Sequence, residues 1–141
     1  MILRYGNVKS YTSYDGNPFS EHASKGAVKF LDLSIPQYGL PVFDWVLSLE
    51  VAEHIPAQYE SIYLDNVARF AEEGVVLSWA HPGQGGRSHV NTRPGVYVNQ
   101  ELLKRGLVRD VVATKYAKQN ASYAWIVENV NVFRRVQPFF D

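Results

Sequence analysis

The sequence predicts an α/β layered fold that is built on a largely parallel sheet. Two near-continuous apolar runs of strand length, at 43–49 and 75–80, indicate strands that are covered on both faces. Between them lies a segment whose apolar residues recur at the spacing of one helix face: Tyr59, Ile62, Tyr63, Val67 and Phe70. Strands that are buried on both faces and alternate with helices are typical of such a sheet.

The first third of the chain predicts four short elements. They are the last turn of a helix at 1–5, a strand at 8–14, a short helix at 18–23 and a strand at 27–31. Gly6 suits the position after the last turn of a helix, where a left-handed backbone is common. The pair Asp15-Gly16 is a strong turn signal and ends the first of the two strands.

After the strand at 43–49, Pro56 suits the first turn of a helix, and Gly74 marks its end. The pattern that follows the strand at 75–80 predicts four segments: a helix capped by Asn99 and closed by Gly106, a strand at 107–114, a loop at 115–123 and a last strand at 125–135. We see no repeat and no linker, and therefore expect one domain over residues 1–141.

Composition excludes several classes of function. Lys plus Arg number 14 and Asp plus Glu number 14, and this balance argues against a strongly electrostatic nucleic-acid binder. No cysteine is present, which excludes disulfides, thiolate metal sites and thiol nucleophiles. The sequence has neither a signal peptide nor an apolar run of roughly 20 residues, so we expect a soluble cytoplasmic protein without a membrane partner.

Polar residues follow each predicted strand at its carboxyl end, where ligands bind in α/β sheets. Asp15 follows the first strand and could accept hydrogen bonds from a ribose diol. Asp32 follows the second and could accept one from an exocyclic amine. The structural alternatives are a simple turn at Asp15 and a helix cap or solvated loop acid at Asp32.

The stretch DWVLSLEVAEHIP places Glu50, Glu53 and His54 directly after a buried strand. Their spacing of i, i+3 and i+4 puts all three on one face of any helical turn. Two carboxylates and an imidazole that converge in this way could bind a divalent cation or move a proton. The alternative is that the acids favour the positive end of the following helix, with the histidine packed beside them.

A long loop, HPGQGGRSHVNTRPG, follows the strand at 75–80 and contains two histidines and two arginines. Long ordered loops in compact domains are often functional. Of the two histidines, His81 is the better site candidate because it follows the strand directly, whereas His89 lies further along. The alternative is a flexible, glycine-rich tip.

Taken together, these segments resemble the class I S-adenosylmethionine-dependent methyltransferases. SYDGNP is similar to the family's second strand with its ribose-binding acid, KFLDLS to the segment that brackets adenine, and FDWVLSLEVAEHIP to the fourth strand and its motif. EEGVVLSW resembles the fifth strand, and WIVENVNVFRR the last, antiparallel one. The resemblance implies an incomplete Rossmann-like sheet, mostly parallel, with an antiparallel C-terminal strand. It also implies that S-adenosylmethionine is the cofactor.

The resemblance also implies roles for single residues. The cofactor contacts would be Asp15, Gly16, Asp32, Leu33 and Ser48. The base that takes the acceptor proton would be Glu50, His54 or His81. A non-catalytic interaction module derived from a methyltransferase is the alternative.

The family places one more strand and a G-x-G-x-G turn before the second strand, and neither is found here. The chain begins with MILRYG, which resembles the end of the helix after that turn, so the resemblance implies an N-terminal truncation. We therefore expect weak or absent cofactor binding. Two strand edges would lack their neighbour, so we expect a homo-oligomer or a partner chain to cover them.

A narrower resemblance concerns the E-x-x-E-H pattern, which is similar to that of small-RNA 2′-O-methyltransferases. It implies a Mg²⁺ site at Glu50, Glu53 and His54, with His81 or His89 as a further ligand. The neutral net charge gives RNA little support, so we expect a small-molecule methyl acceptor rather than a nucleic acid.

Overall fold

The computed structural model describes residues 8–139, and the chain divides into two compact units, Met1–Leu33 and Ser34–Asp141. The first unit contains β1 (Ser13–Asp15), α1 (Ser20–Ala23) and β2 (Val28–Phe30). The single domain over residues 1–141 stays a prediction. Among the described residues, no helix is long and apolar enough to cross a membrane.

In the first unit, β1 and β2 pair in parallel, with Ser13 opposite Val28 and Asp15 opposite Phe30. The short helix α1 connects them, as the sequence predicts for 18–23. The Ser24 hydroxyl accepts a hydrogen bond from the backbone N–H of Val28 at 2.9 Å and so fixes the return into β2. Of the predicted strand at 8–14, only Ser13 and Tyr14 belong to β1, which extends to Asp15, and the predicted helical turn at 1–5 lies outside the described residues.

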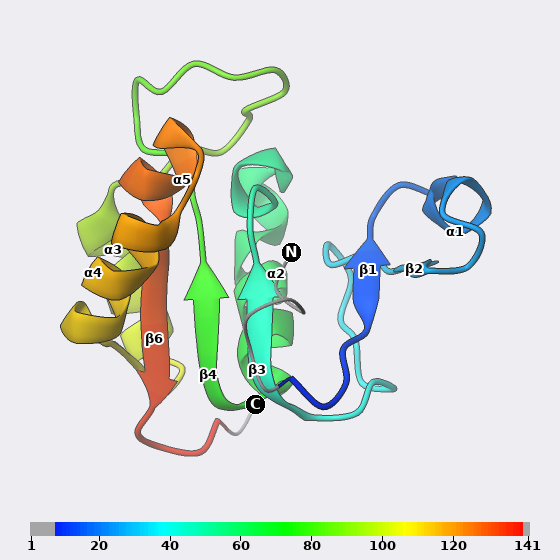
Figure 1. Cartoon of the computed structure of the whole chain (residues 1–141), viewed down its shortest axis with the longest axis horizontal. Coiled ribbons are helices and arrows are strands. Elements are labelled where there is room, and N and C mark those ends of the chain that lie inside the picture. Colours follow the sequence, from blue (N-terminus) through cyan, green and yellow to red (C-terminus); the bar gives the residue numbers. More distant parts are fainter. Residues whose placement is uncertain (1–7, 140–141) are drawn as a thin grey trace. The chain divides into compact units, whose positions relative to one another are not determined.

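The second unit contains the remaining elements in the order shown in Figure 1. They are β3 (Phe43–Ser48), η2 (Ala52–His54), η3 (Ala57–Tyr59), α2 (Glu60–Arg69), β4 (Ala71–Leu77), α3 (Gly95–Leu103), β5 (Leu107–Arg109), α4 (Val111–Asn120), α5 (Ala124–Asn129) and β6 (Asn131–Arg135).

These strands form one sheet in the order β3-β4-β6-β5. β3 and β4 are parallel, and β6 runs antiparallel to both β4 and β5. β5 therefore runs in the same direction as β3 and β4, and only the last strand is reversed. This confirms the predicted mostly parallel, Rossmann-like sheet with an antiparallel C-terminal strand.

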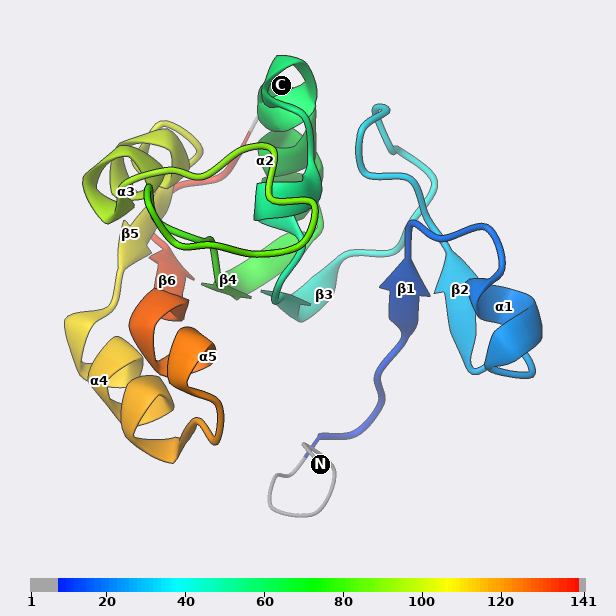
Figure 2. The same ribbon diagram turned by 90° about the horizontal axis from the view of Figure 1, so that it is seen from above.

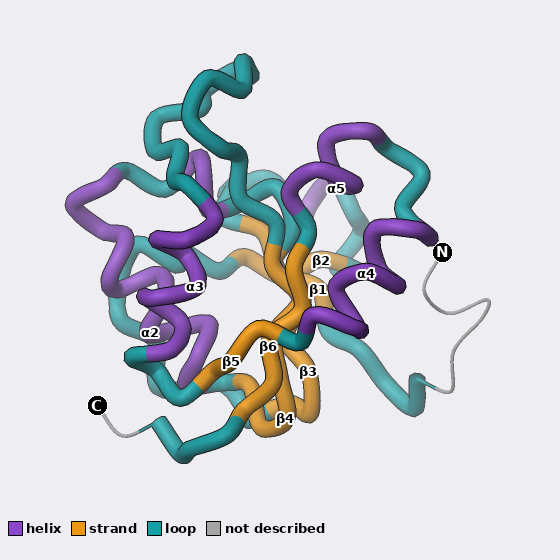
Figure 3. The backbone as a smooth tube through the Cα atoms, turned by 90° about the vertical axis from the view of Figure 1, so that its left-hand side faces the viewer, coloured by secondary structure: helices purple, strands orange, loops and turns teal. Residues whose placement is uncertain are grey.

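Helices cover both faces of this sheet. Figures 2 and 3 show α2 and α3 on one face and α4 and α5 on the other. The largest fully buried apolar side chains come from the strands and from α2 and α3. They are Tyr63, Leu64, Val75, Leu77, Leu102, Leu107 and Phe133. Burial on both faces explains the apolar run of β4, whereas β3 lies at an edge of the sheet and leaves Leu47 48% exposed, so the expected burial of that strand on both faces was wrong.

The sequence prediction of a helix up to Gly74 was wrong. α2 ends at Arg69, and Gly74 lies inside β4. The Trp45 ring of β3 lies over this position, so a β-carbon at Gly74 would overlap the ring and the carbonyl oxygen of Phe133. The glycine is thus needed for a close approach within the sheet rather than for a helix end.

The segment after β5 also differs from the prediction. Residues predicted as the end of a strand and as a loop form α4, which begins after Asp110. The Asp110 carboxylate accepts a hydrogen bond from the N–H of Ala113 at 2.8 Å, as an N-cap residue does. The cap therefore outweighs the strand preference of the β-branched Val111 and Val112, which lie exposed on the helix.

Two other boundaries differ. α3 begins after Pro94 and not at Asn99, and the predicted last strand divides into α5 and the shorter β6. Gly106 follows α3 in a left-handed conformation with φ of 74°, as expected for the residue that closes a helix.

Candidate functional site

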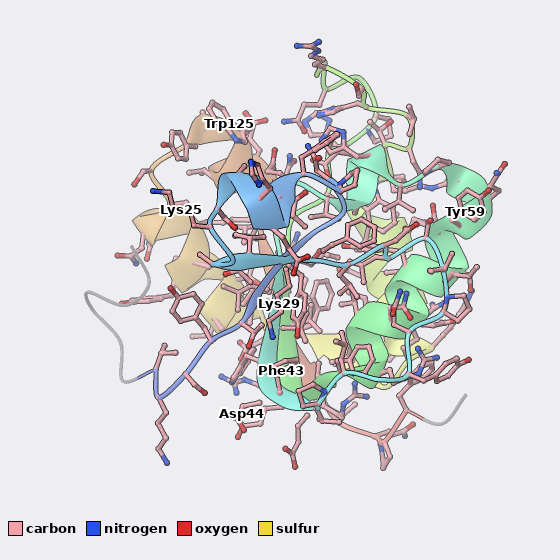
Figure 4. All side chains as sticks on the ribbon, turned by 90° about the vertical axis from the view of Figure 1, so that its right-hand side faces the viewer. Lys25, Lys29, Phe43, Asp44, Tyr59 and Trp125 are labelled. Atoms are coloured by element: carbon pink, nitrogen blue, oxygen red, sulfur yellow. The ribbon has the colours of Figure 1, made fainter. Side chains whose placement is uncertain are left out.

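The carboxyl ends of β3 and β4 lie at the same edge of the sheet in the second unit. Glu50, Glu53 and His54 follow β3, while Ser78 and the long loop follow β4. Figure 1 shows this loop beyond the ends of both strands, and Figure 4 shows Phe43 and Asp44 at the opposite end of β3. The two segments that follow the strands build the candidate site.

Glu50 is fixed by the neighbouring strand end. The Ser78 hydroxyl accepts a hydrogen bond from the Glu50 backbone N–H at 2.7 Å and donates one to Glu50 Oε1 at 2.8 Å. Glu50 adopts a left-handed backbone with φ of 57°, which is uncommon for a residue other than glycine. Such backbone strain is typical of functional sites, because the surrounding contacts must hold it.

Glu53 is fully buried, and neither of its carboxylate oxygens has a hydrogen-bond partner among residues 8–139. Burial raises the pKa of this carboxyl above its ordinary value. The nearby Glu50 carboxylate acts in the same direction, whereas the two imidazoles of His54 and His89 oppose it. A buried carboxylate without a partner is costly, so a ligand or a proton is needed to satisfy it.

His54 and His89 face each other beside this carboxylate. Their ring centroids lie 5.2 Å apart in an edge-to-face arrangement. His54 Nδ1 lies 3.0 Å from the backbone carbonyl oxygen of Ser88. Because a carbonyl can only accept, Nδ1 carries a proton, which leaves Nε2 as the ring nitrogen that can hold a ligand.

The loop that carries His89 is held at its base. The carbonyl oxygen of Glu53 accepts hydrogen bonds from the N–H groups of Val90 at 2.9 Å and Asn91 at 3.1 Å. The Trp79 indole N–H donates to the carbonyl oxygen of Asn91 at 2.6 Å. These bonds place His89 beside Glu53, although the two residues are far apart in sequence.

A second anchor involves Glu60, the first residue of α2. Glu60 Oε2 accepts from Asn91 Nδ2 at 2.8 Å and from Arg93 Nε at 2.7 Å, while the Tyr97 hydroxyl donates to Oε1. The bond to Glu60 is the main reason that the pKa of Tyr97 rises to about 12. This buried network closes the loop against α2.

Glu53, His54 and His89 each offer one ligand atom, and these atoms lie within 4.8 Å of one another. One carboxylate oxygen and two imidazole nitrogens form a common ligand set for divalent cations. The hydrogen bond from His54 Nδ1 to Ser88 resembles the outer bonds that orient histidine ligands in metal sites. The residues present therefore fit a divalent cation.

The predicted metal ligands were Glu50, Glu53 and His54, with His81 or His89 as a further ligand. The group that the structure brings together contains Glu53, His54 and His89, but neither Glu50 nor His81. The His81 ring instead lies 3.7 Å from the Glu128 carboxylate of α5, and its Nδ1 lies 3.0 Å from the carbonyl oxygen of Pro82. The geometry thus favours His89 over His81, the reverse of the preference drawn from the sequence.

Ser48, a predicted cofactor contact, is buried at the end of β3. Its hydroxyl lies 2.7 Å from the hydroxyl of Tyr63 in α2. Burial is the main cause that raises the pKa of Tyr63, so this phenol stays neutral. The Ser48 side chain therefore ties the strand to the helix within the core.

The other predicted cofactor residues belong to the first unit. Asp15 ends β1, and its Oδ1 accepts a hydrogen bond from the N–H of Asn17 at 2.7 Å, which forms an Asx turn together with Gly16. Asp32 and Leu33 follow β2. Since β1 and β2 are parallel, Asp15 and Asp32 come after the same ends of the two strands, as the sequence predicts.

Several residues of the site escaped the sequence reading. Ser78, Glu60, Asn91 and Tyr97 act through contacts with residues far away in the chain. Only the polar Ser78 inside the apolar run VVLSWA was a visible signal.

The sequence matches no protein-family model and no curated protein. The structure is similar to that of LepI in complex with S-adenosylmethionine, with a TM-score of 0.62 and 15% identity over 96% of this chain and 38% of that one. It is similar to the CMeT domain of the citrinin polyketide synthase, with a TM-score of 0.62 and 11% identity over 97% of this chain and 41% of that one.

A third similar structure is magnesium protoporphyrin IX methyltransferase (ChlM) from Synechocystis PCC 6803 with bound S-adenosylhomocysteine. Here the TM-score is 0.54 and the identity 16%, over 82% of this chain and 58% of that one. The chain thus spans about two fifths to three fifths of the length of these proteins. Together with the sheet order and the reversed last strand, these similarities show that the chain has the Rossmann-like fold of S-adenosylmethionine-dependent methyltransferases.

Proposed function

We propose that this chain is an S-adenosylmethionine-dependent methyltransferase-like protein that acts on a small-molecule acceptor. The observation that carries the proposal is the cluster of Glu50, Glu53 and His54 at the carboxyl end of β3, in a fold whose solved examples hold S-adenosylmethionine or S-adenosylhomocysteine. Ligands bind at this edge of open α/β sheets.

The residues of the first unit suit the nucleoside part of the cofactor. Asp15 is exposed at the end of β1, where a carboxylate can accept from a ribose diol, and Asp32 and Leu33 follow β2. When bound, S-adenosylmethionine supplies an electrophilic methyl group on its sulfonium. In the second unit, the lone pair of His54 Nε2 is available to take the acceptor proton.

We further propose that this chain binds the cofactor weakly. The segment before β1 contains a single glycine, Gly6, and thus no glycine pair that would let backbone amides approach the methionine part. The glycine-rich stretch Gly83–Gly86 follows β4, so it cannot take the place of a glycine-rich turn before β1.

Calorimetric titration with S-adenosylhomocysteine tests both statements. We expect millimolar affinity that Asp15→Ala removes and Asp44→Ala keeps, because Asp44 is an exposed aspartate at the other end of β3. Micromolar affinity would contradict the impairment. No binding at any concentration would favour the alternative, a non-catalytic interaction module.

A second candidate function is divalent-cation-dependent methyl transfer. It is supported by the buried and unpartnered carboxylate of Glu53 between two imidazoles. A cation such as Mg²⁺ or Mn²⁺ at Glu53, His54 and His89 would polarise an acceptor oxygen when bound. The Glu50 carboxylate, which Ser78 holds, helps to raise the pKa of Glu53.

Cobalt absorption spectroscopy, with Mg²⁺ and Mn²⁺ as competitors, tests this candidate. We expect Glu53→Gln to abolish the binding of Co²⁺ and Glu72→Gln, at an exposed position of β4, to leave it unchanged. Without metal, Glu53→Gln should raise the free energy of unfolding by about 1 kcal/mol, since it removes a buried charge that has no partner. Equal Co²⁺ affinity in both variants would exclude the site.

A further inference from the structure

A hollow of about 360 Å³ lies beside α4 and α5, on the other face of the sheet from α2. Its lining includes Arg109, Lys115, Lys118 and the two valines Val111 and Val127. None of the residues of the Glu53, His54 and His89 cluster lines it. Its volume falls at the small end of the range of about 300 to 1,000 Å³ that small-molecule pockets occupy.

All of the charged residues that line this hollow are cations. Arg109 Nε is buried without a hydrogen-bond partner among residues 8–139. By contrast, Arg93, Arg105 and Arg134 each form an ion pair with a carboxylate. A guanidinium can donate two parallel hydrogen bonds to one carboxylate or phosphate, so an unpaired one marks a place where an anion is missing.

Lys118 strengthens the positive field around Arg109. Its pKa is lowered, first by burial and then by the charge of Arg109, which places the two cations close to each other. Lys118 Nζ donates a hydrogen bond to the carbonyl oxygen of Glu128 at 2.7 Å, and the Glu128 carboxylate offsets only part of the lowering of the pKa. An anion between the two side chains would relieve their repulsion.

The hollow also has an apolar wall, and the polar residues Thr114 and Gln119 complete its lining. Val111 is 66% and Val127 37% exposed, although both carry aliphatic side chains on helices that cover the sheet. Exposed apolar walls next to the two neighbouring cations Arg109 and Lys118 match a ligand with an anionic head and a hydrocarbon part.

We propose that this hollow binds a small amphiphilic carboxylate, with its head at Arg109 and Lys118 and its hydrocarbon chain against Val111 and Val127. The inference is independent of methyl transfer, because it uses no residue of the candidate active site. The carboxylate could be a free acid or the acidic end of a larger metabolite.

Octanoate is a suitable probe, with octanol and acetate as comparisons that lack the charge or the chain. Binding is measured by calorimetry and located by amide chemical shifts in α4 and α5. We expect octanoate to bind at least tenfold more tightly than either comparison, and Arg109→Gln to weaken it about tenfold or more. Arg87→Gln, at an exposed position of the long loop, should leave the affinity unchanged.

Arg109 Nε has no hydrogen-bond partner in the described part of the chain, so the melting temperature of Arg109→Gln should match that of the wild type. If that variant fails to fold, Lys118→Gln tests the same charge pair. Equal affinity for octanol, unchanged octanoate binding in the variant that folds, or shifts confined to other helices would overturn the proposal. A longer-chain diacid that binds as well as octanoate would identify the larger metabolite as the source.

Discussion

The ring of His89 lies directly against Gly86, three residues earlier in the same loop. A β-carbon at Gly86 would overlap Cε1 and Nε2 of this ring, whereas one at Gly85 would meet open space. Glycine at position 86 therefore lets the imidazole turn back toward Glu53 and His54. The position of the His89 ring, which completes the candidate metal site, thus depends on Gly86, a residue without a functional side chain.

Gly86→Ala should consequently displace His89 and weaken the binding of Co²⁺ by about tenfold or more, as is usual when a metal ligand loses its support. Gly85→Ala is the matched control and should keep the wild-type affinity. Cobalt titrations of both variants provide the measurement, and equal affinities would show that His89 does not contribute.

Glu60 should be needed both for the stability of the fold and for the position of the long loop that it anchors. Glu60→Ala removes the acceptor of Asn91, Arg93 and Tyr97, and it leaves buried donors without a partner. We expect the free energy of unfolding in urea to fall by about 2 to 3 kcal/mol. Glu72→Ala, at an exposed position, should change it by less than about 0.5 kcal/mol. A similarly small effect at Glu60 would contradict the proposed anchor.

The parts of the fold that follow from local pattern were predictable. The apolar runs correctly predicted the strands β3 and β4, although only β4 is largely buried, and the acids after β3 stand out because that run stops at Glu50. α4 was missed because Val111 and Val112 favour strands, while its start is decided by one hydrogen bond, which the Ala113 N–H donates to the Asp110 carboxylate. A single cap can reverse a weak local preference.

The site was only half predictable for a related reason. Glu53 and His54 are neighbours in sequence, so spacing alone brings them together. The choice between His81 and His89 depends on the bonds from Val90 and Asn91 to Glu53 and on the space at Gly86. Such contacts join segments that are more than 30 residues apart, and no local pattern encodes them.

The close approach of β3 and β4 at Gly74 gives a stability prediction. Gly74→Ala would push a methyl group into the Trp45 ring and the backbone of Phe133, and backbone cannot move aside easily. We expect a loss of up to about 3 kcal/mol in the free energy of unfolding. Gly39→Ala adds its methyl group in open space and should cost little. Denaturant unfolding of the two variants measures the difference, and equal losses would contradict the packing argument.

Asp110 gives a prediction about pH. The N–H of Ala113, and then the Arg134 guanidinium 2.6 Å away, hold the pKa of this carboxyl below its ordinary value. Its contribution to stability is therefore present above the pKa of the unfolded chain, about 3.9. It is lost as the pH falls through the lower pKa of the folded state.

Asp110→Asn keeps a capping side chain but not the charge. We expect the variant to melt below the wild type at pH 7 and the two melting temperatures to converge toward pH 2. Thermal scans across this range provide the measurement. A difference that stays constant with pH would show that the charge of Asp110 does not stabilise the fold.

The outer edge of β3 gives the last prediction. Among the described residues, β3 pairs with β4 alone. The Ser48 carbonyl oxygen accepts from the N–H of Ser78 on the β4 side, so the backbone groups of Leu47, one residue earlier, point to the other edge. The Leu47 side chain is 48% exposed. An apolar edge of this kind recruits another strand, and we propose that a second copy or a partner chain supplies it.

Light scattering after size-exclusion chromatography should therefore show the mass of a defined oligomer. If a partner chain supplies the strand instead, the mass should be that of a monomer and should rise when the partner is present. Leu47→Lys places a charge on the edge and should shift the oligomer toward the monomer, since charged residues on an edge oppose strand pairing. Leu103→Lys is the control, because Leu103 is also exposed but lies on α3. A wild-type protein that stays monomeric at high concentration and in a cell extract would contradict the proposal, because its unpaired edge would then be stable in water.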